Sequence, residues 1–255
     1  MGLARSLTAL LGRPRRIVAG ALALIISLGW LCLVMTPMPM PASGVAGNWT
    51  ANYLAWSLAM WFVMMVAMMT PAVSPVILLY DRVMHGDKPG WHGRTLGFLV
   101  GYLLAWGLFS AAATLAQALM LEAGFIDAMG MASSRRSAAL VLLAVALYQF
   151  SAAKAACLER CHSPLGFIVR RRRGPIRGVR AGLSHGAWCI GCCGVLMLLL
   201  FVGGVMNLAW VAGITVAVTL EKLTPDPKRV RIAIGIGALL GAGWLASTGM
   251  LESGH

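Results

Sequence analysis

The sequence is poor in charge, because Asp, Glu, Lys and Arg make up only 11% of its 255 residues and just 8 residues are acidic. It has no polar stretch long enough to form a soluble domain with its own core, and no internal repeat. It also lacks a glycine-rich phosphate-binding loop, paired carboxylates within an apolar segment, and a Ser/His/Asp arrangement. These absences exclude a separate soluble domain and argue against phosphate-binding and hydrolytic enzymes.

The chain is instead rich in apolar sequence. Hydrophobic residues make up 59% of it and its mean hydropathy is +0.80, above the roughly half apolar content of ordinary soluble domains. We therefore predict an all-α fold, a polytopic transmembrane helical bundle. Apolar stretches near the roughly 20 residues that a helical span requires give about seven spans, at residues 17–36, 54–80, 95–120, 137–154, 185–206, 208–221 and 231–250.

The basic residues predict the orientation of the bundle. If the N-terminus is cytoplasmic, every lysine and arginine except Arg135 and Arg136 falls on the cytoplasmic side, as the positive-inside rule requires. The chain then divides into a basic cytoplasmic N-terminus at 1–16, a transmembrane helical domain at 17–250 and an outer C-terminal tail at 251–255. The first apolar stretch is longer than the core of a secretory signal, which favours a retained anchor over cleavage.

The net charge of +13 and the run Arg170–Arg173 could indicate nucleic-acid binding. A cytoplasmic loop beside anionic lipid explains the same residues with fewer assumptions. We therefore expect the lipid bilayer, and no nucleic acid, to be the partner of the basic residues.

Three cysteines and a histidine stand in one apolar segment. On a helix of 3.6 residues per turn, the four side chains project from one stripe; they are His185, Cys189, Cys192 and Cys193. Polar and reactive groups inside a membrane span are costly unless they face a partner, so the stripe predicts a functional site. The alternative is that each cysteine only packs as a small hydrophobic residue.

A second thiol pair closes the fourth predicted span, where Cys157 and Cys161 are one helical turn apart. The fifth span begins at the same membrane face, so we expect both cysteine groups near the inner leaflet. Cytoplasmic thiols stay reduced, which favours metal binding or redox chemistry over structural disulfides. Two polar neighbours, Lys154 and Glu221, are predicted to support the site from outside the ligand set or to form an interfacial ion pair.

The ligand types predict the metal. Thiolates select cuprous copper, zinc or an iron–sulfur cluster, and two or three thiolates on a monovalent ion carry less charge into the bilayer than four on zinc. We therefore expect a soft transition metal ion, with Cu(I) as the first candidate and zinc as the second. Zinc stays a candidate because His185 offers a nitrogen ligand. The predicted metal ligands are Cys157, Cys161, His185, Cys189, Cys192 and Cys193.

The second predicted span carries a row of methionines. Met60, Met64 and Met68 repeat every four residues, and Met65 with Met69 form an adjacent row. Thioethers bind Cu(I), so the five methionines together are predicted to form a ladder of soft ligands, with Met60, Met64 and Met68 as the relay for copper. The alternative is the gap-filling role that methionine often has in apolar cores.

Three segments carry a family resemblance: MMVAMMTP at 64–71, KAACLERCHSP at 154–164, and CIGCCGVLM at 189–197 with GVMN following at 204–207. Together they resemble a bacterial family known as predicted metal-binding integral membrane proteins. The resemblance implies a multi-pass protein of the bacterial inner membrane that binds metal through the cysteines of these motifs. The chain departs from the pattern at Trp188 and Gly194, where a tyrosine and an aromatic residue are expected, and neither change removes a ligand.

We therefore expect a protein that binds or handles a soft metal ion, in trafficking or in support of assembly, with a metallochaperone or a membrane complex as partner. No residue is predicted to be catalytic. One alternative is a membrane thiol–disulfide oxidoreductase, which usually needs a cysteine pair near the outer face, where only Cys32 lies. Another is a structural zinc site in an assembly factor.

Overall fold

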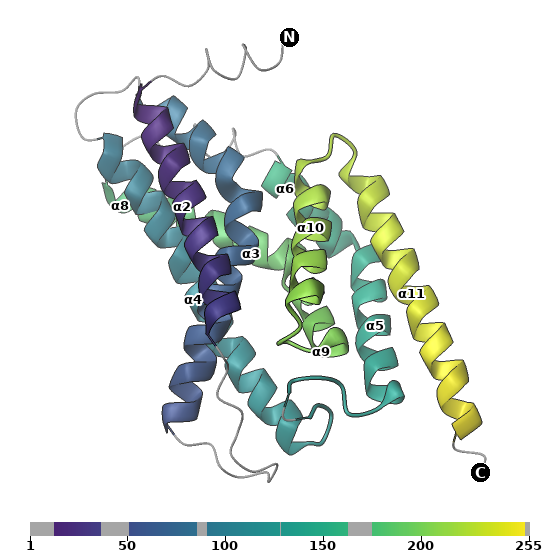
Figure 1. Cartoon of the computed structure of the whole chain (residues 1–255). Helices are drawn as coiled ribbons and strands as arrows, with labels where there is room; N and C mark the ends of the chain where they lie inside the picture. Colours follow the sequence, from purple (N-terminus) through teal and green to yellow (C-terminus); the bar gives the residue numbers. More distant parts are fainter. Residues whose placement is uncertain (1–12, 37–50, 86–90, 128, 163–174, 253–255) are drawn as a thin grey trace.

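The computed structural model describes residues 13–36, 51–85, 91–127, 129–162 and 175–252. Within these ranges the secondary structure is helical, apart from an isolated antiparallel bridge between Ile126 and Ala132. Helix α2 (Arg13–Met35) begins at one end of a bundle, and α11 (Pro227–Glu252) finishes at the opposite end (Figure 1). The prediction of an all-α fold is confirmed.

The elements between these two helices follow the predicted spans. In chain order they are α3 (Ala51–His85), α4 (Trp91–Glu122), α5 (Arg135–Phe150), α6 (Ala152–His162), α8 (Pro175–Cys193), the 3₁₀ helix η1 (Val195–Leu199), α9 (Leu200–Gly203) and α10 (Leu208–Leu223). The end of α6, the end of α10 and the start of α11 all lie at the end of the bundle where α2 begins (Figure 1).

Four described helices are long and apolar enough to cross a membrane, at 17–35, 51–83, 93–122 and 227–248. Two bent helix pairs pass the same test when each pair is taken as one span, which raises the number to up to 6. The predicted span at 208–221 corresponds to α10, whose 16 residues fall short of the roughly 20 that a span requires. The total of about seven spans therefore stays a prediction.

The predicted span at 137–154 is not one helix. It is divided at Ser151, where α5 and α6 meet at an angle of 65°. The backbone of Ser151 is extended, and its hydroxyl accepts a hydrogen bond from the backbone N–H of Lys154 at 3.1 Å, in the manner of a helix N-cap. The serine thus begins a new helix, which carries Cys157 and Cys161 in a new direction.

The predicted span at 185–206 is also bent, by 49°, after Cys193. Gly194 stands at the bend, and a Cβ atom added there would lie 2.6 Å from the carbonyl oxygen of Ile190. A larger residue at this position would therefore force the backbone to shift. Helix α8 begins well before residue 185, at Pro175, because proline is well suited to the first position of a helix.

The predicted outer boundaries fall mostly outside the described residues. Of the segment 1–16, residues 13–16 already belong to α2, and of the tail 251–255 the first two residues belong to α11. The arginine run at 170–173 lies outside the described residues as well.

Helices α4 and α8 pack backbone to backbone. Gly178, Gly182 and Gly186 are spaced one turn apart along α8. A Cβ atom added to Gly178 would lie 2.5 Å from a carbonyl oxygen of α4, and one added to Gly182 would lie closer still to another. Glycine permits this close approach because it has no side chain. The contact brings Tyr102 of α4 against the end of α8 that bears the cysteines.

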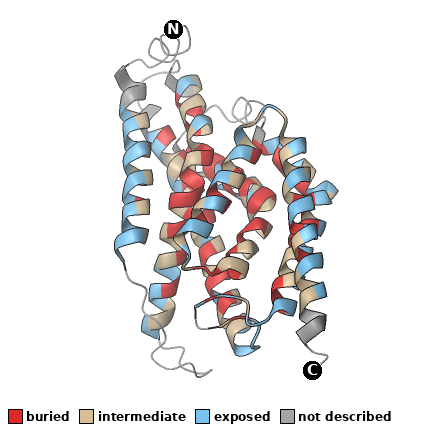
Figure 2. Cartoon of the chain, turned by 45° about the vertical axis from the view of Figure 1, so that its right-hand side comes forward, coloured by how far each residue is buried: buried red, intermediate tan, exposed pale blue. Residues whose placement is uncertain are grey.

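Buried residues gather in the centre of the bundle, and exposed residues lie along its outer helices (Figure 2). In an apolar 18-residue stretch of α3, 50% of the residues are buried, compared with 11% in the corresponding stretch of α2. On α2, the side chains of Leu24, Leu28 and Leu31 are exposed. Soluble monomers seldom expose an apolar face of this kind.

Candidate metal site

Three cysteines end α8, and all three are buried. The thiols of Cys192 and Cys193 donate to the carbonyl oxygen of Cys189, with Sγ to oxygen distances of 3.1 Å and 2.9 Å. Their sulfur atoms therefore gather about one carbonyl group. The helix that the predicted stripe requires extends through all of its members, from His185 to Cys193.

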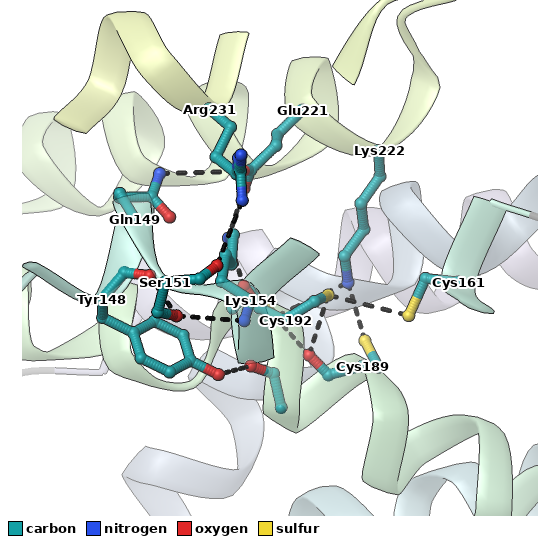
Figure 3. A network of polar contacts seen from close by, with 12 residues as sticks. Tyr148, Gln149, Ser151, Lys154, Cys161, Cys189, Cys192, Glu221, Lys222 and Arg231 are labelled. Atoms are coloured by element: carbon teal, nitrogen blue, oxygen red, sulfur yellow. Dashed lines mark hydrogen bonds and ion pairs between the residues drawn. The ribbon is translucent and has the colours of Figure 1, made fainter. Parts of the chain in front are cut away.

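The ammonium group of Lys222 contacts two of these sulfur atoms. From the end of α10, its Nζ atom lies 2.7 Å from the Sγ of Cys189 (Figure 3). It also lies 3.5 Å from the Sγ of Cys193. The hydroxyl of Tyr102 lies 3.3 Å from the Sγ of Cys189. A cation is thus held by two sulfur atoms inside the bundle, and it favours negative charge on them.

Cys192 meets a different partner, Cys161 of α6. Their Sγ atoms are 3.7 Å apart, and both residues are buried (Figure 3). Cys157, one turn earlier on α6, is half-buried, and its sulfur lies 2.8 Å from where a Cβ atom on Gly191 would stand. The two predicted thiol groups therefore meet through Cys161 and Cys192, while Cys157 packs on the backbone of α8.

A cavity of about 180 Å³ adjoins these groups. Two thiols, an imidazole and an ammonium line it, opposite the proline-bearing part of α3; the lining residues are Ala72, Val73, Pro75, Val76, Leu79, Cys161, His185, Cys189, Lys222 and Leu223. The His185 ring is buried, and its centroid lies 5.8 Å from that of Phe98 and 6.1 Å from that of Tyr102. Soft donors and a space for an ion thus occur together.

Lys154 and Glu221 form an ion pair in the interior, with Nζ and Oε2 2.8 Å apart (Figure 3). Both side chains are almost completely buried, so the predicted pair forms, and it lies in the interior of the protein. Gln149 donates to the other carboxylate oxygen at 3.5 Å, and the ammonium of Lys154 also donates to the carbonyl oxygen of Cys192. Lys154 therefore supports the backbone of the site, whereas the ammonium that contacts sulfur belongs to Lys222.

Most of the methionines of α3 lie in the core. The buried ones are Met64, Met65, Met68 and Met69. The Sδ atom of Met69 lies 3.7 Å from the Sγ of Cys193. Met60 is half-buried and lines a separate cavity of about 120 Å³ together with Cys32. The methionine that contacts a cysteine is thus Met69, of the adjacent row, and a relay through Met60, Met64 and Met68 stays a prediction.

Sequence reasoning did not assign Lys222, Tyr102 or Met69 to the site. The sequence could have indicated Lys222, because this residue follows Glu221 at the end of an apolar helix. Nothing in the sequence indicates a role for Tyr102, because aromatic residues are common in apolar helices. Among the described residues, no three His, Cys, Asp or Glu side chains are arranged to hold a metal ion together, so the predicted set of six is divided into smaller groups.

Comparison with protein families places the chain in a class, the copper chaperones. The family model that matches is PpoB2, described as a copper chaperone, and it covers residues 58–245; the chain belongs to this family. None of the curated proteins and none of the solved structures matches it. The family confirms the prediction of metal handling and supports copper, but it supports neither zinc nor thiol–disulfide exchange.

Proposed function

We propose that the chain is a membrane-embedded copper chaperone that holds Cu(I) between α8 and α10, with Cys189 and Cys193 as the principal ligands, and passes it to a protein partner. The observation that carries the proposal is the contact of one cation, the Lys222 ammonium, with both of these sulfur atoms. Thiolate sulfur selects soft monovalent copper. The arrangement therefore supports Cu(I) as cargo.

Charge favours this assignment. Two thiolates and Cu(I) leave a single net negative charge, which is costly in an apolar interior unless a positive group lies beside it. Lys222 supplies that group. Zinc usually takes four ligands in a closed site, and the described residues do not bring three of its usual donors together.

Neighbouring donors support a role in transfer. Cys161 and His185 line the cavity that Cys189 also lines, and Cys161 lies next to Cys192. A chaperone must release its cargo. Additional donor atoms close to the principal ligands allow one ligand to replace another while the ion stays coordinated. Cys161, Cys192 and His185 are therefore proposed as exchange ligands, and Lys154 with Glu221 as the pair that positions Cys192.

We further propose that the bundle lies in the bacterial inner membrane with its N-terminus in the cytoplasm. Four to six apolar helices support this, as does the exposed leucine face of α2. The end of α6, the end of α10 and the start of α11 lie at one end of the bundle (Figure 1), and they carry Arg160, Lys222, Lys228, Arg229 and Arg231. This distribution fits the positive-inside rule and supports a copper site near the cytoplasmic leaflet.

Copper content of purified protein tests the proposal. The wild type, loaded with Cu(I) under reducing conditions in detergent, is expected to retain stoichiometric copper after desalting. Cys189→Ser combined with Cys193→Ser should abolish retention, because serine oxygen is a poor ligand for Cu(I). Cys32→Ser is the matched control, since Cys32 is exposed and distant from the cluster in sequence. Unchanged copper in the double variant would refute the ligand assignment.

A further inference from the structure

We propose that the thioether of Met69 is a third ligand of the bound Cu(I) and the residue that makes the site prefer monovalent copper to zinc. This inference rests on the proposed function and adds a donor from α3 to the two thiols of α8. Its basis is the contact between the sulfur atoms of Met69 and Cys193.

The distance between these sulfur atoms matches a shared ion. With metal–sulfur bonds of roughly 2.3 Å, the value for zinc thiolates, two sulfur atoms in a trigonal arrangement are roughly 4.0 Å apart. The Sδ of Met69 and the Sγ of Cys193 are 3.7 Å apart. Only a small adjustment would be needed for these two atoms to bind one ion, and Cys189 is the further candidate ligand because the same ammonium contacts its sulfur and that of Cys193.

The chemistry of a thioether explains the preference. A thioether is neutral and soft, so it binds Cu(I) well, whereas zinc sites use thiolate, imidazole and carboxylate ligands. A neutral third ligand also adds no further negative charge to a buried site. Met69 itself is fully buried, which suits a donor that never needs to be hydrated.

The helix holds Met69 in a region that adjoins the cavity. Ala72, Val73 and Pro75, which follow it on α3, line the same cavity as Cys189. Met65, one turn earlier, is as buried as Met69. The chain therefore offers a matched control on the same helix, with the same side chain and the same burial.

The test compares Met69→Leu with Met65→Leu in the full-length protein. Competition with chromophoric chelators should show Cu(I) binding about tenfold weaker in Met69→Leu, with Zn(II) binding unchanged. X-ray absorption of the loaded protein should show one sulfur neighbour fewer around copper. Met65→Leu should match the wild type in both measurements. Exchange of methionine for leucine conserves volume and usually costs less than about 1.5 kcal/mol, so both variants are expected to fold.

The outcomes separate this inference from the proposed function. If Met69→Leu binds Cu(I) as tightly as the wild type, or if both leucine variants weaken it equally, Met69 is not a ligand and the thiol site stands. If the wild type binds no copper, the proposed function and this inference fail together.

Discussion

The two faces of α8 hold their cysteines by different means. On one face, Cys189 and Cys193 contact a flexible ammonium and a thioether, from Lys222 and Met69. On the other face, Cys192 contacts a thiol of α6, and its carbonyl group is held by Lys154. The first face offers groups that can move aside for an ion, and the second is fixed by a buried ion pair.

This difference gives the tandem cysteines separate roles. Adjacent residues on a helix are about 100° apart around its axis, and the sulfur atoms of Cys192 and Cys193 accordingly contact different side chains, Cys161 and Met69. We infer that Cys193 binds the cargo, while Cys192 belongs to the fixed side and takes part only in exchange.

Lys154→Leu should cause the largest loss of stability, because it removes the ammonium that is ion-paired with the carboxylate of Glu221 in the interior. Breaking a buried ion pair in this way typically costs about 3–5 kcal/mol. Thermal unfolding of the detergent-solubilised protein should show a clearly lower midpoint. The double change Lys154→Leu with Glu221→Leu should recover much of the stability, and a single variant as stable as the wild type would contradict the fixed role of the pair.

Cys161→Ser combined with Cys192→Ser should retain stoichiometric copper but bind it about tenfold more weakly. The reason is that exchange ligands near the site are lost while Cys189 and Cys193 remain. The chelator competition used for the methionine variants measures this change. Complete loss of copper would remove the distinction between the two faces.

Lys222→Gln should weaken Cu(I) binding by roughly threefold to tenfold, because the net negative charge of the loaded site is no longer offset. Lys222→Arg keeps the positive charge and is the matched control, expected to lie between the glutamine variant and the wild type. Tighter binding in the glutamine variant would mean that the ammonium competes with copper rather than supporting it.

Cys157→Ser should have the smallest effect, with copper stoichiometry and affinity close to those of the wild type. Its sulfur packs beside Gly191 and is half-buried, so it is not placed among the principal ligands. Copper analysis of the single variant is sufficient. A loss comparable to that of the Cys189 and Cys193 double variant would place Cys157 in the ligand set.

Local patterns predicted most of the helices and the grouping of the cysteines. Apolar length marks a helix wherever it occurs, and the spacing of Cys189 and Cys193 fixes their common face. The breaks at Ser151 and Gly194 were not predicted, because each depends on one cap or one steric contact inside an apolar run. Long-range partners such as Tyr102 were not predictable, since nothing local distinguishes them.

Glu221 and Lys222 show most clearly what sequence patterns cannot predict about the site. The two residues are neighbours at the end of α10, and sequence reasoning assigned the acidic one to the site. In the structure they point to different partners, one to Lys154 and the other to the thiols (Figure 3). Which of two adjacent residues faces a site depends on the rotation of the helix, and packing with the rest of the bundle sets that rotation.

The glycine contact between α4 and α8 has a mechanical consequence. Where two backbones touch, no side chain can change rotamer to let one helix slide along the other. Helix α8, which bears the cysteines, is therefore packed rigidly against α4. Small side-chain movements cannot change the contact between the two helices. We therefore expect entry and departure of an ion to depend on movement of the helices around α8, such as α10, whose Lys222 side chain contacts the sulfur of Cys189.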